Sequence, residues 1–309
     1  MEPGRRALRG TGGPPPRRAP FRLSRGLAYM ILAAFFFSCM AALVKLACRR
    51  LPPMEVVFAR SVLSAALSLG LALHARAPII GRRPALLVTR GAVGSIALAL
   101  YFYALAHLKL ADAVTLQYTN PILVTLFAPL VLEEPGNRRQ WVVVGTAFAG
   151  MLLILRPEAE VGLWPGMAAA LSAFGSAAAY ALVRKLSATE HPLTIVLYFP
   201  VVSALFSLPF VLADFVRPEG AEWAALAGVA VTTTIAQVFL TWSLTLEPAA
   251  RATSVSYWGI LFGAVLGWLV FGETPDRLAA AGAALIIGAT ALLARSAAAP
   301  AATPAATST

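Results

Sequence analysis

The stretch LQYTNPILVTLFAPLVLEEP, residues 116–135, places hydrogen-bonding groups inside an apolar run. Amide and phenol groups both donate and accept hydrogen bonds, so they could hold a polar solute. A proline in a helix interior removes one backbone hydrogen bond, which predicts a bend or a local opening at Pro121. The polar residues are Gln117, Tyr118, Thr119 and Asn120, the prolines Pro121 and Pro129, and the closing acids Glu133 and Glu134.

Two interpretations of this polar group remain open from the sequence. Gln117 and Pro121, at i and i+4, share a helix face that can point into a cavity, with Tyr118 and Asn120 beside it. Alternatively, Gln117 and Asn120 hydrogen-bond neighbouring helices. We take Gln117, Tyr118 and Asn120 as candidate substrate-binding residues.

Arg60 lies several residues inside an expected apolar helix. An ionisable side chain in hydrocarbon costs at least about 2.5 kcal/mol, so Arg60 needs a partner. It either pairs with Glu55 or contacts a substrate anion. Arg90 is similarly placed and could extend toward the membrane surface. Other candidate substrate-binding residues are Tyr103, Gln237, Trp242, Tyr257 and Trp258, and candidate gating or helix-breaking residues are Pro121, Glu133 and Glu273.

Motifs for covalent or metal chemistry are missing from the sequence. The two cysteines have no CxxC spacing, the three histidines occur singly, and no GxxxxGK[ST], GxSxG or HExxH pattern occurs. All acidic residues fall in tails, loops or expected helix ends, so no carboxylate is placed to carry a coupling proton. We therefore expect no enzyme, no metal and no cofactor, but a facilitator or exchanger for an anionic or zwitterionic metabolite with an apolar or ring portion.

Composition indicates a membrane protein. Of 309 residues, 59% are hydrophobic and 13% charged, against roughly a quarter charged in soluble domains. The apolar runs do not alternate as barrel strands would. We predict ten transmembrane helices, at 26–48, 54–75, 84–106, 111–132, 139–156, 162–186, 191–212, 222–246, 249–271 and 275–295.

The basic residues predict the orientation of the chain. With the N-terminus inside, 16 lysines and arginines lie in inner segments and 7 in outer ones. Both termini are then cytosolic in a multi-pass protein of the cell (inner) membrane. The net charge of +11 thus reflects orientation, with no nucleic-acid partner expected. Residues 1–25 and 296–309 are expected to be disordered tails.

The chain contains two copies of one unit. At an offset of 139–140 residues, LPPMEVVFAR (51–60) lies over EHPLTIVLYF (190–199) and LVLEEP (130–135) over LVFGETP (269–275). Each copy, 26–156 and 162–295, would hold five helices. An odd number makes the second copy enter the membrane from the opposite side, which is an inverted repeat with a substrate site between the copies.

These features resemble the EamA-type members of the drug/metabolite transporter superfamily. The resemblance rests on Lys45, Pro53, Arg60 and the run from Pro121 to Glu133, repeated in the second half, with departures at Phe199 and Leu261. It implies an all-α protein of two inverted five-helix repeats that moves a small metabolite or drug by alternating access. A flippase for a lipid-linked substrate, a membrane enzyme and a noncatalytic membrane scaffold are the alternatives. Substrate, direction, coupling and oligomeric state stay open.

Overall fold

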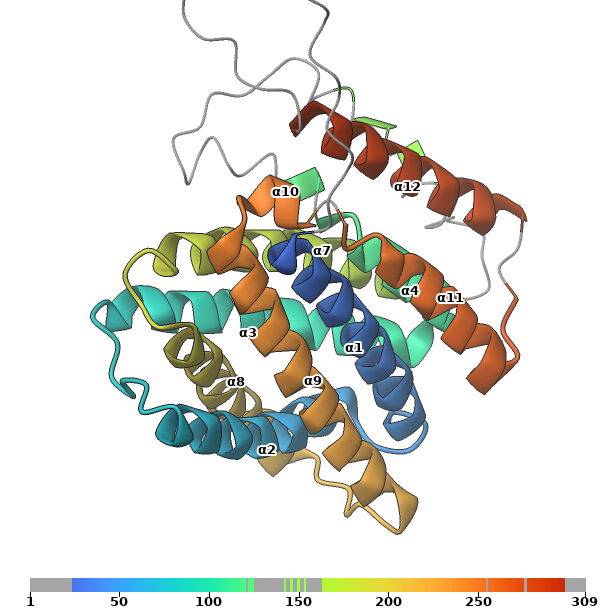
Figure 1. Cartoon of the computed structure of the whole chain (residues 1–309). Helices are drawn as coiled ribbons and strands as arrows, with labels where there is room; N and C mark the ends of the chain where they lie inside the picture. The colour runs from blue at the N-terminus through green and yellow to red at the C-terminus, as the bar shows by residue number, and fades with distance from the viewer. Residues whose placement is uncertain are drawn as a thin grey trace, which may run out of the picture.

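The computed structural model is built of α-helices. It describes residues 24–120, 122–124, 142, 145–146, 149–150, 153, 163–253, 255–274 and 277–297, among which there is no strand. The helices are α1 (Arg25–Ala47), α2 (Pro53–His74), α3 (Pro84–His107), α4 (Leu110–Gln117), α7 (Leu163–Leu186), α8 (Pro192–Ala213), α9 (Ala221–Leu246), α10 (Ala249–Thr253), α11 (Trp258–Phe271) and α12 (Arg277–Ala297) (Figure 1).

Local sequence explains where the helices begin and end. The Ser24 side chain accepts a hydrogen bond of 3.2 Å from the Leu27 amide at the start of α1. Helices α2, α3 and α8 each begin at a proline, a residue whose fixed φ and missing N–H suit the first helical position. α11 ends at Phe271 and is followed by Gly272, which has a φ of 66° that favours glycine.

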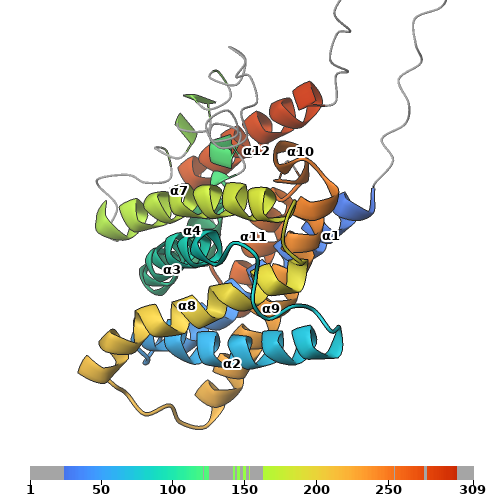
Figure 2. The same ribbon diagram turned by 90° about the vertical axis from the view of Figure 1, so that its left-hand side faces the viewer.

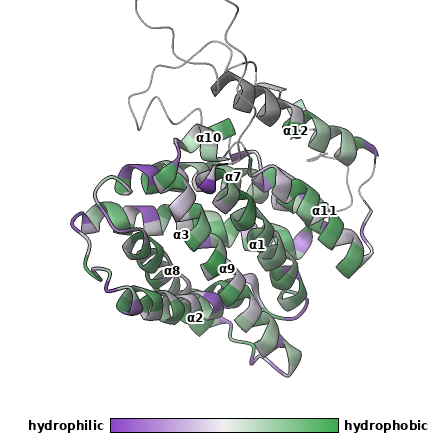
Figure 3. Cartoon of the chain, viewed as in Figure 1, coloured by the Kyte–Doolittle hydropathy of each residue, from purple (hydrophilic) through white to green (hydrophobic). Residues whose placement is uncertain are grey.

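Among the described residues, six helices are long and apolar enough to cross a membrane: α1, α2, α3, α7, α8 and α9. Hydrophobic residues make up most of these helices (Figure 3). Helix α2 shows the pattern of a membrane helix, because its serines are buried and its leucines exposed. Small polar residues allow close helix contact where lipid removes the usual hydrophobic driving force. The buried serines are Ser61, Ser64 and Ser68, and the exposed leucines Leu63, Leu67 and Leu71.

The packing of the helices follows the repeat found in the sequence. At the offset of 139 residues, α7, α8 and α9 correspond to α1, α2 and α3. α1 packs against α9 and α3 packs against α7, so the same contact occurs twice (Figures 1 and 2). α2 packs against its own counterpart, α8, and α4 packs against α11. This pattern agrees with two halves of matching structure.

One predicted helix, 249–271, is interrupted. α10 ends at Thr253, and α11 begins at Trp258 after a turn that contains Tyr257. The Thr253 hydroxyl donates to the Ala249 carbonyl, and the Ser256 hydroxyl donates to the Thr253 carbonyl. Such local bonds offer the backbone an alternative to the helix ladder.

The first repeat has a break at the corresponding position. α4 ends at Gln117, and the Thr119 hydroxyl donates to the Leu116 carbonyl at 2.7 Å. Tyr118 and Tyr257 are 139 residues apart, so the interruption recurs in both repeats. The rest of segment 111–132 and segment 139–156 lie largely outside the described residues, so the number of ten spans stays a prediction.

Three glycines of α11 lie on the face that packs against α4. A Cβ atom at Gly259 would meet the Tyr118 ring at 2.0 Å, and one at Gly263 would meet Val114 at 2.7 Å. Gly267 lies against Leu110. The GxxxGxxxG spacing therefore serves close approach of two helices.

Candidate functional site

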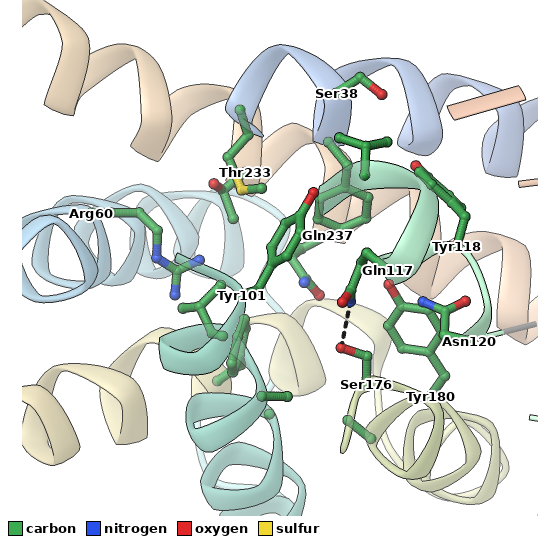
Figure 4. A pocket seen from close by; sticks show the side chains of 18 of the residues that line it. Ser38, Arg60, Tyr101, Gln117, Tyr118, Asn120, Ser176, Tyr180, Thr233 and Gln237 are labelled. Carbon is green, nitrogen blue, oxygen red and sulfur yellow. Dashed lines mark hydrogen bonds between the residues drawn. The ribbon is translucent and has the colours of Figure 1, made fainter. Parts of the chain in front are cut away.

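A cavity lies between the two halves of the chain. Its lining comes from α1, α2, α3 and α4 in the first half and from α7, α8 and α9 in the second. Arg60 enters from one side, while Gln117, Asn120, Ser176 and Tyr180 gather on the other (Figure 4). The polar and aromatic lining residues are Phe37, Ser38, Arg60, Arg90, Tyr101, Gln117, Tyr118, Asn120, Ser176, Tyr180, Phe199, Thr233 and Gln237.

Gln117 both lines the cavity and connects two helices. Its amide nitrogen donates to the Ser176 hydroxyl at 2.8 Å, and its amide oxygen accepts from Ser172 at 2.9 Å (Figure 4). Gln117 therefore both faces the cavity and hydrogen-bonds a neighbouring helix, and its role in substrate binding stays a prediction. Asn120 is buried, and its Oδ1 atom has no hydrogen-bond partner.

Tyr118 lies where the broken helices of the two repeats meet α1. Its hydroxyl donates to the Ala34 carbonyl at 3.4 Å, and its ring lies against Gly259 of α11. The Ser38 hydroxyl of α1 contacts the Gly259 carbonyl at 3.2 Å. Ser38 and Tyr118 thus join α1, α4 and α11 at one wall of the cavity.

Two fully buried arginines share one aromatic ring. The guanidinium carbons of Arg60 and Arg90 lie 5.1 Å and 4.3 Å from the centre of the Phe199 ring. This is the geometry of a cation–π contact. Arg90 also donates to the Gln237 amide oxygen at 3.1 Å.

Glu55 is not the partner of Arg60. Its Oε2 atom accepts a hydrogen bond from the Val216 amide at 2.9 Å, and its Oε1 atom is buried without a partner. The five-residue separation turns Glu55 and Arg60 to different faces of α2. Of the two possibilities for Arg60, pairing with Glu55 is therefore wrong.

Four predicted binding residues do not line the cavity. Tyr103 and Trp242 are exposed on the outer faces of α3 and α9, and Trp258 is exposed at the start of α11. Tyr257 is half-buried and stacks on Trp258, with ring centres 6.2 Å apart. Helical rotation explains why Tyr103 points away from the cavity. Tyr101 faces the cavity, and Tyr103, two residues further along the helix, is rotated by about 200° from it.

Glu273 connects the two repeats at one end of the bundle. Its carboxylate lies 2.7 Å from the Lys45 ammonium and accepts a hydrogen bond of 2.7 Å from the Leu110 amide. Lys45 also donates to the Leu108 carbonyl. The other two candidate gating residues, Pro121 and Glu133, lie outside the described residues.

A second ion pair lies at the same end. Arg50 donates to both carboxylate oxygens of Glu222, from Nε at 2.7 Å and from Nη2 at 2.5 Å. This hydrogen-bonded carboxylate raises the pKa of Arg50. Both ion pairs hold the C-terminal end of α1 to the second half of the chain.

Several lining residues were not among the binding residues selected from the sequence. On α3, Arg90, Gly94, Leu98 and Tyr101 all face the cavity, and their spacing of four, four and three residues marks one helix face. That spacing was a usable signal. Phe199 and Tyr180 carried no such signal, because an aromatic residue in an apolar helix can face lipid as well as a cavity.

The arrangement suits reversible binding of a solute. The lining combines guanidinium, amide, hydroxyl and aromatic groups, and no group of three metal-binding side chains occurs among the described residues. An apolar exterior around this cavity defines an integral membrane protein with an internal cavity. The chain belongs to the EamA-like transporter family, whose model matches twice, at residues 24–156 and 163–295.

Relatives of the chain are membrane transporters for different small molecules. The pseudopaline exporter CntI of Pseudomonas aeruginosa is 38% identical over 88% of this chain and 97% of its own length. A riboflavin transporter of Vibrio cholerae is 29% identical over 62% of this chain and 65% of its own. An S-adenosylmethionine uptake transporter of Rickettsia felis is 24% identical over 86% and 90%.

A solved structure supports the fold. It has a TM-score of 0.66 to this chain and 22% sequence identity, and the match covers 89% of this chain and 99% of the solved one. At this identity the likeness concerns the fold alone. Together, the family match and the relatives identify a small-molecule membrane transporter of the drug/metabolite type.

Proposed function

We propose that the protein is a secondary transporter that moves a small organic solute across the cell membrane by alternating access between two inverted repeats. Both termini would lie in the cytosol, as the distribution of basic residues favours. The solute would be an anionic or zwitterionic metabolite with an apolar or ring portion. The protein would need no cofactor.

The observation that carries this proposal is the origin of the cavity lining. Arg60, Gln117 and Asn120 come from the first half, whereas Ser176, Phe199 and Gln237 come from the second. A solute bound among them contacts both halves, so a relative movement of the halves would change its access to either side. The duplicated packing of α1 on α9 and α3 on α7 supports two units of matching structure.

The ion pair of Lys45 with Glu273 supports a closed end in this conformation. It joins α1 of the first half to the residue that follows α11 in the second. In the proposed orientation this is the outer end of the bundle. We propose that the pair holds that end together and opens when the solute is exchanged.

The test is transport in proteoliposomes with a panel of labelled metabolites. Efflux is measured first, because the pseudopaline relative is an exporter, and uptake second. We expect Arg60→Ala and Gln117→Ala to abolish transport of whichever solute moves. Trp242→Ala is the matched control, because Trp242 lies outside the cavity. If no solute moves in either direction under any ion gradient, the transporter proposal is wrong, and translocation of lipid-linked substrates becomes the next assay.

A further inference from the structure

The cavity holds two positive charges at one end. Arg60 is 0% exposed and Arg90 is 2% exposed. Arg60 lies seven residues from the start of α2 and Arg90 six residues from the start of α3. The two helices run in opposite directions (Figure 1). The two side chains thus approach from opposite ends of the bundle and meet at the Phe199 ring.

Neither guanidinium has its charge balanced by the described part of the chain. Among the described residues, Lys45 pairs with Glu273, and Arg50 pairs with Glu219 and Glu222. No carboxylate there pairs with Arg60 or Arg90. An arginine stays protonated in proteins, so the charges persist. The face of Phe199 attracts a cation but supplies no negative charge.

Several hydrogen-bond donors of these arginines are also free. The Nη2 atom of Arg60 contacts the Ser61 hydroxyl at 3.2 Å, and that of Arg90 contacts Gln237. The Nε and Nη1 atoms of both side chains are buried without a partner. Buried donors without acceptors are costly, and charged ones especially so, which points to a ligand that supplies acceptors.

The opposite side of the cavity has a different character. There the buried Oδ1 atom of Asn120 lacks a donor, and Gln117, Ser176 and Tyr180 surround it with neutral polar groups (Figure 4). An unpaired acceptor favours a ligand with an N–H or O–H group at this end. The cavity therefore has a cationic end at Phe199 and a neutral end at Asn120.

We infer that Arg60 and Arg90 form a binding site for a doubly charged anionic group, and that the solute carries this group at one end and a hydrogen-bond donor at the other. This inference rests on the proposed transport function and defines its substrate class. Two carboxylates or one phosphoryl group would both supply two negative charges and the missing acceptors. A solute with a single negative charge would leave one arginine uncompensated.

The experiment measures binding to the purified full-length protein in detergent by isothermal titration calorimetry. The first arm compares the linear diacids from malonate to adipate with their monoamides, which keep the length and lose one charge. The second arm compares phenyl phosphate with its methyl ester, which is a monoanion. We expect the dianion to bind at least tenfold tighter than its partner in one arm, and that arm identifies the anionic group.

The variants Arg60→Gln and Arg90→Gln should each remove this preference. Arg82→Gln is the control, because Arg82 is exposed and lies outside the cavity. Thermal unfolding checks folding, and neither cavity variant should unfold at a lower temperature than the parent, since each removes an uncompensated buried charge.

The inference is wrong if no dianion binds, if every dianion and its monoanionic partner bind equally, or if either cavity variant keeps the preference. Binding in detergent does not require transport. A dianion preference without transport in liposomes would refute the proposed function alone. Transport without that preference would refute the anion site alone.

Discussion

The ion pair between Lys45 and Glu273 should contribute more to stability than the exposed pair at the same end of the bundle. Both side chains are 16% exposed, and the charges lie 2.7 Å apart. At an effective dielectric constant of about 20, charges 2.7 Å apart attract by about 6 kcal/mol before desolvation is subtracted. Exposed pairs give up to about 1 kcal/mol, and breaking a buried pair costs about 3–5 kcal/mol.

We therefore expect a coupling energy of about 2 kcal/mol between Lys45 and Glu273, between those limits. The measurement is a double-mutant cycle of Lys45→Met and Glu273→Gln, read by thermal unfolding in detergent at one scan rate. With an unfolding entropy of about 2.1 cal/mol/K per residue, a loss of about 2 kcal/mol corresponds to a shift of about 3 °C in the unfolding temperature of a chain of 309 residues. In each single variant, the charged side chain that remains keeps its backbone partner: Lys45 keeps the Leu108 carbonyl, and Glu273 keeps the Leu110 amide. This limits the loss of stability from leaving one charge without its ion-pair partner.

The matched control is the pair of Arg50 and Glu222, whose side chains are 42% and 20% exposed. Its coupling should be smaller and should fall with added salt, because ions screen exposed charges. The reasoning is refuted if the coupling of Lys45 with Glu273 is below about 0.5 kcal/mol. Equal salt sensitivity of the two pairs would refute it as well.

Two further predictions concern helix packing and the cavity wall. Gly263→Ala would place a Cβ atom within 2.7–3.1 Å of three Val114 atoms, so it should destabilise the protein by about 1–3 kcal/mol. Val114→Ala in the same chain should restore part of that loss, whereas Gly288→Ala, which meets no atom within 4 Å, should not destabilise; thermal unfolding measures all three. Tyr101→Phe should weaken solute binding measured by calorimetry, and Tyr103→Phe should leave it unchanged, because only Tyr101 lines the cavity. Equal effects of the two tyrosine variants would contradict the cavity assignment.

Much of the architecture could be predicted from the sequence because lipid imposes simple rules. Apolar segments of about 20 residues must be helices, since every backbone group needs an internal partner. The offset of 139 residues likewise predicted that the two halves match, and the duplicated contact of α1 with α9 and α3 with α7 agrees. The interruption near Tyr257 was missed because hydropathy does not register side chains that bond the local backbone.

The cavity could be predicted only in part. Arg60, Gln117 and Gln237 were found because polar residues in apolar helices need partners, and these three line the cavity. Tyr103 and Trp242 were selected by residue type, but their place on the helix circumference turns them outward. Side-chain direction depends on the rotation of each helix against its neighbours, which sequence composition does not encode.

The repeat also explains why a symmetric frame holds an asymmetric site. Arg60 and Phe199 occupy equivalent positions in the two halves and contact each other, so both would lie near the axis that relates the proposed inverted repeats. The position equivalent to Arg90 is Val229, a buried apolar residue. The first half thus supplies the charge, and the second supplies the ring and the Gln237 amide. A solute held by both arginines would move with the first half during the proposed movement. Its contacts with Phe199 and Gln237 of the second half would change. The free energy of the movement would therefore depend on the bound solute.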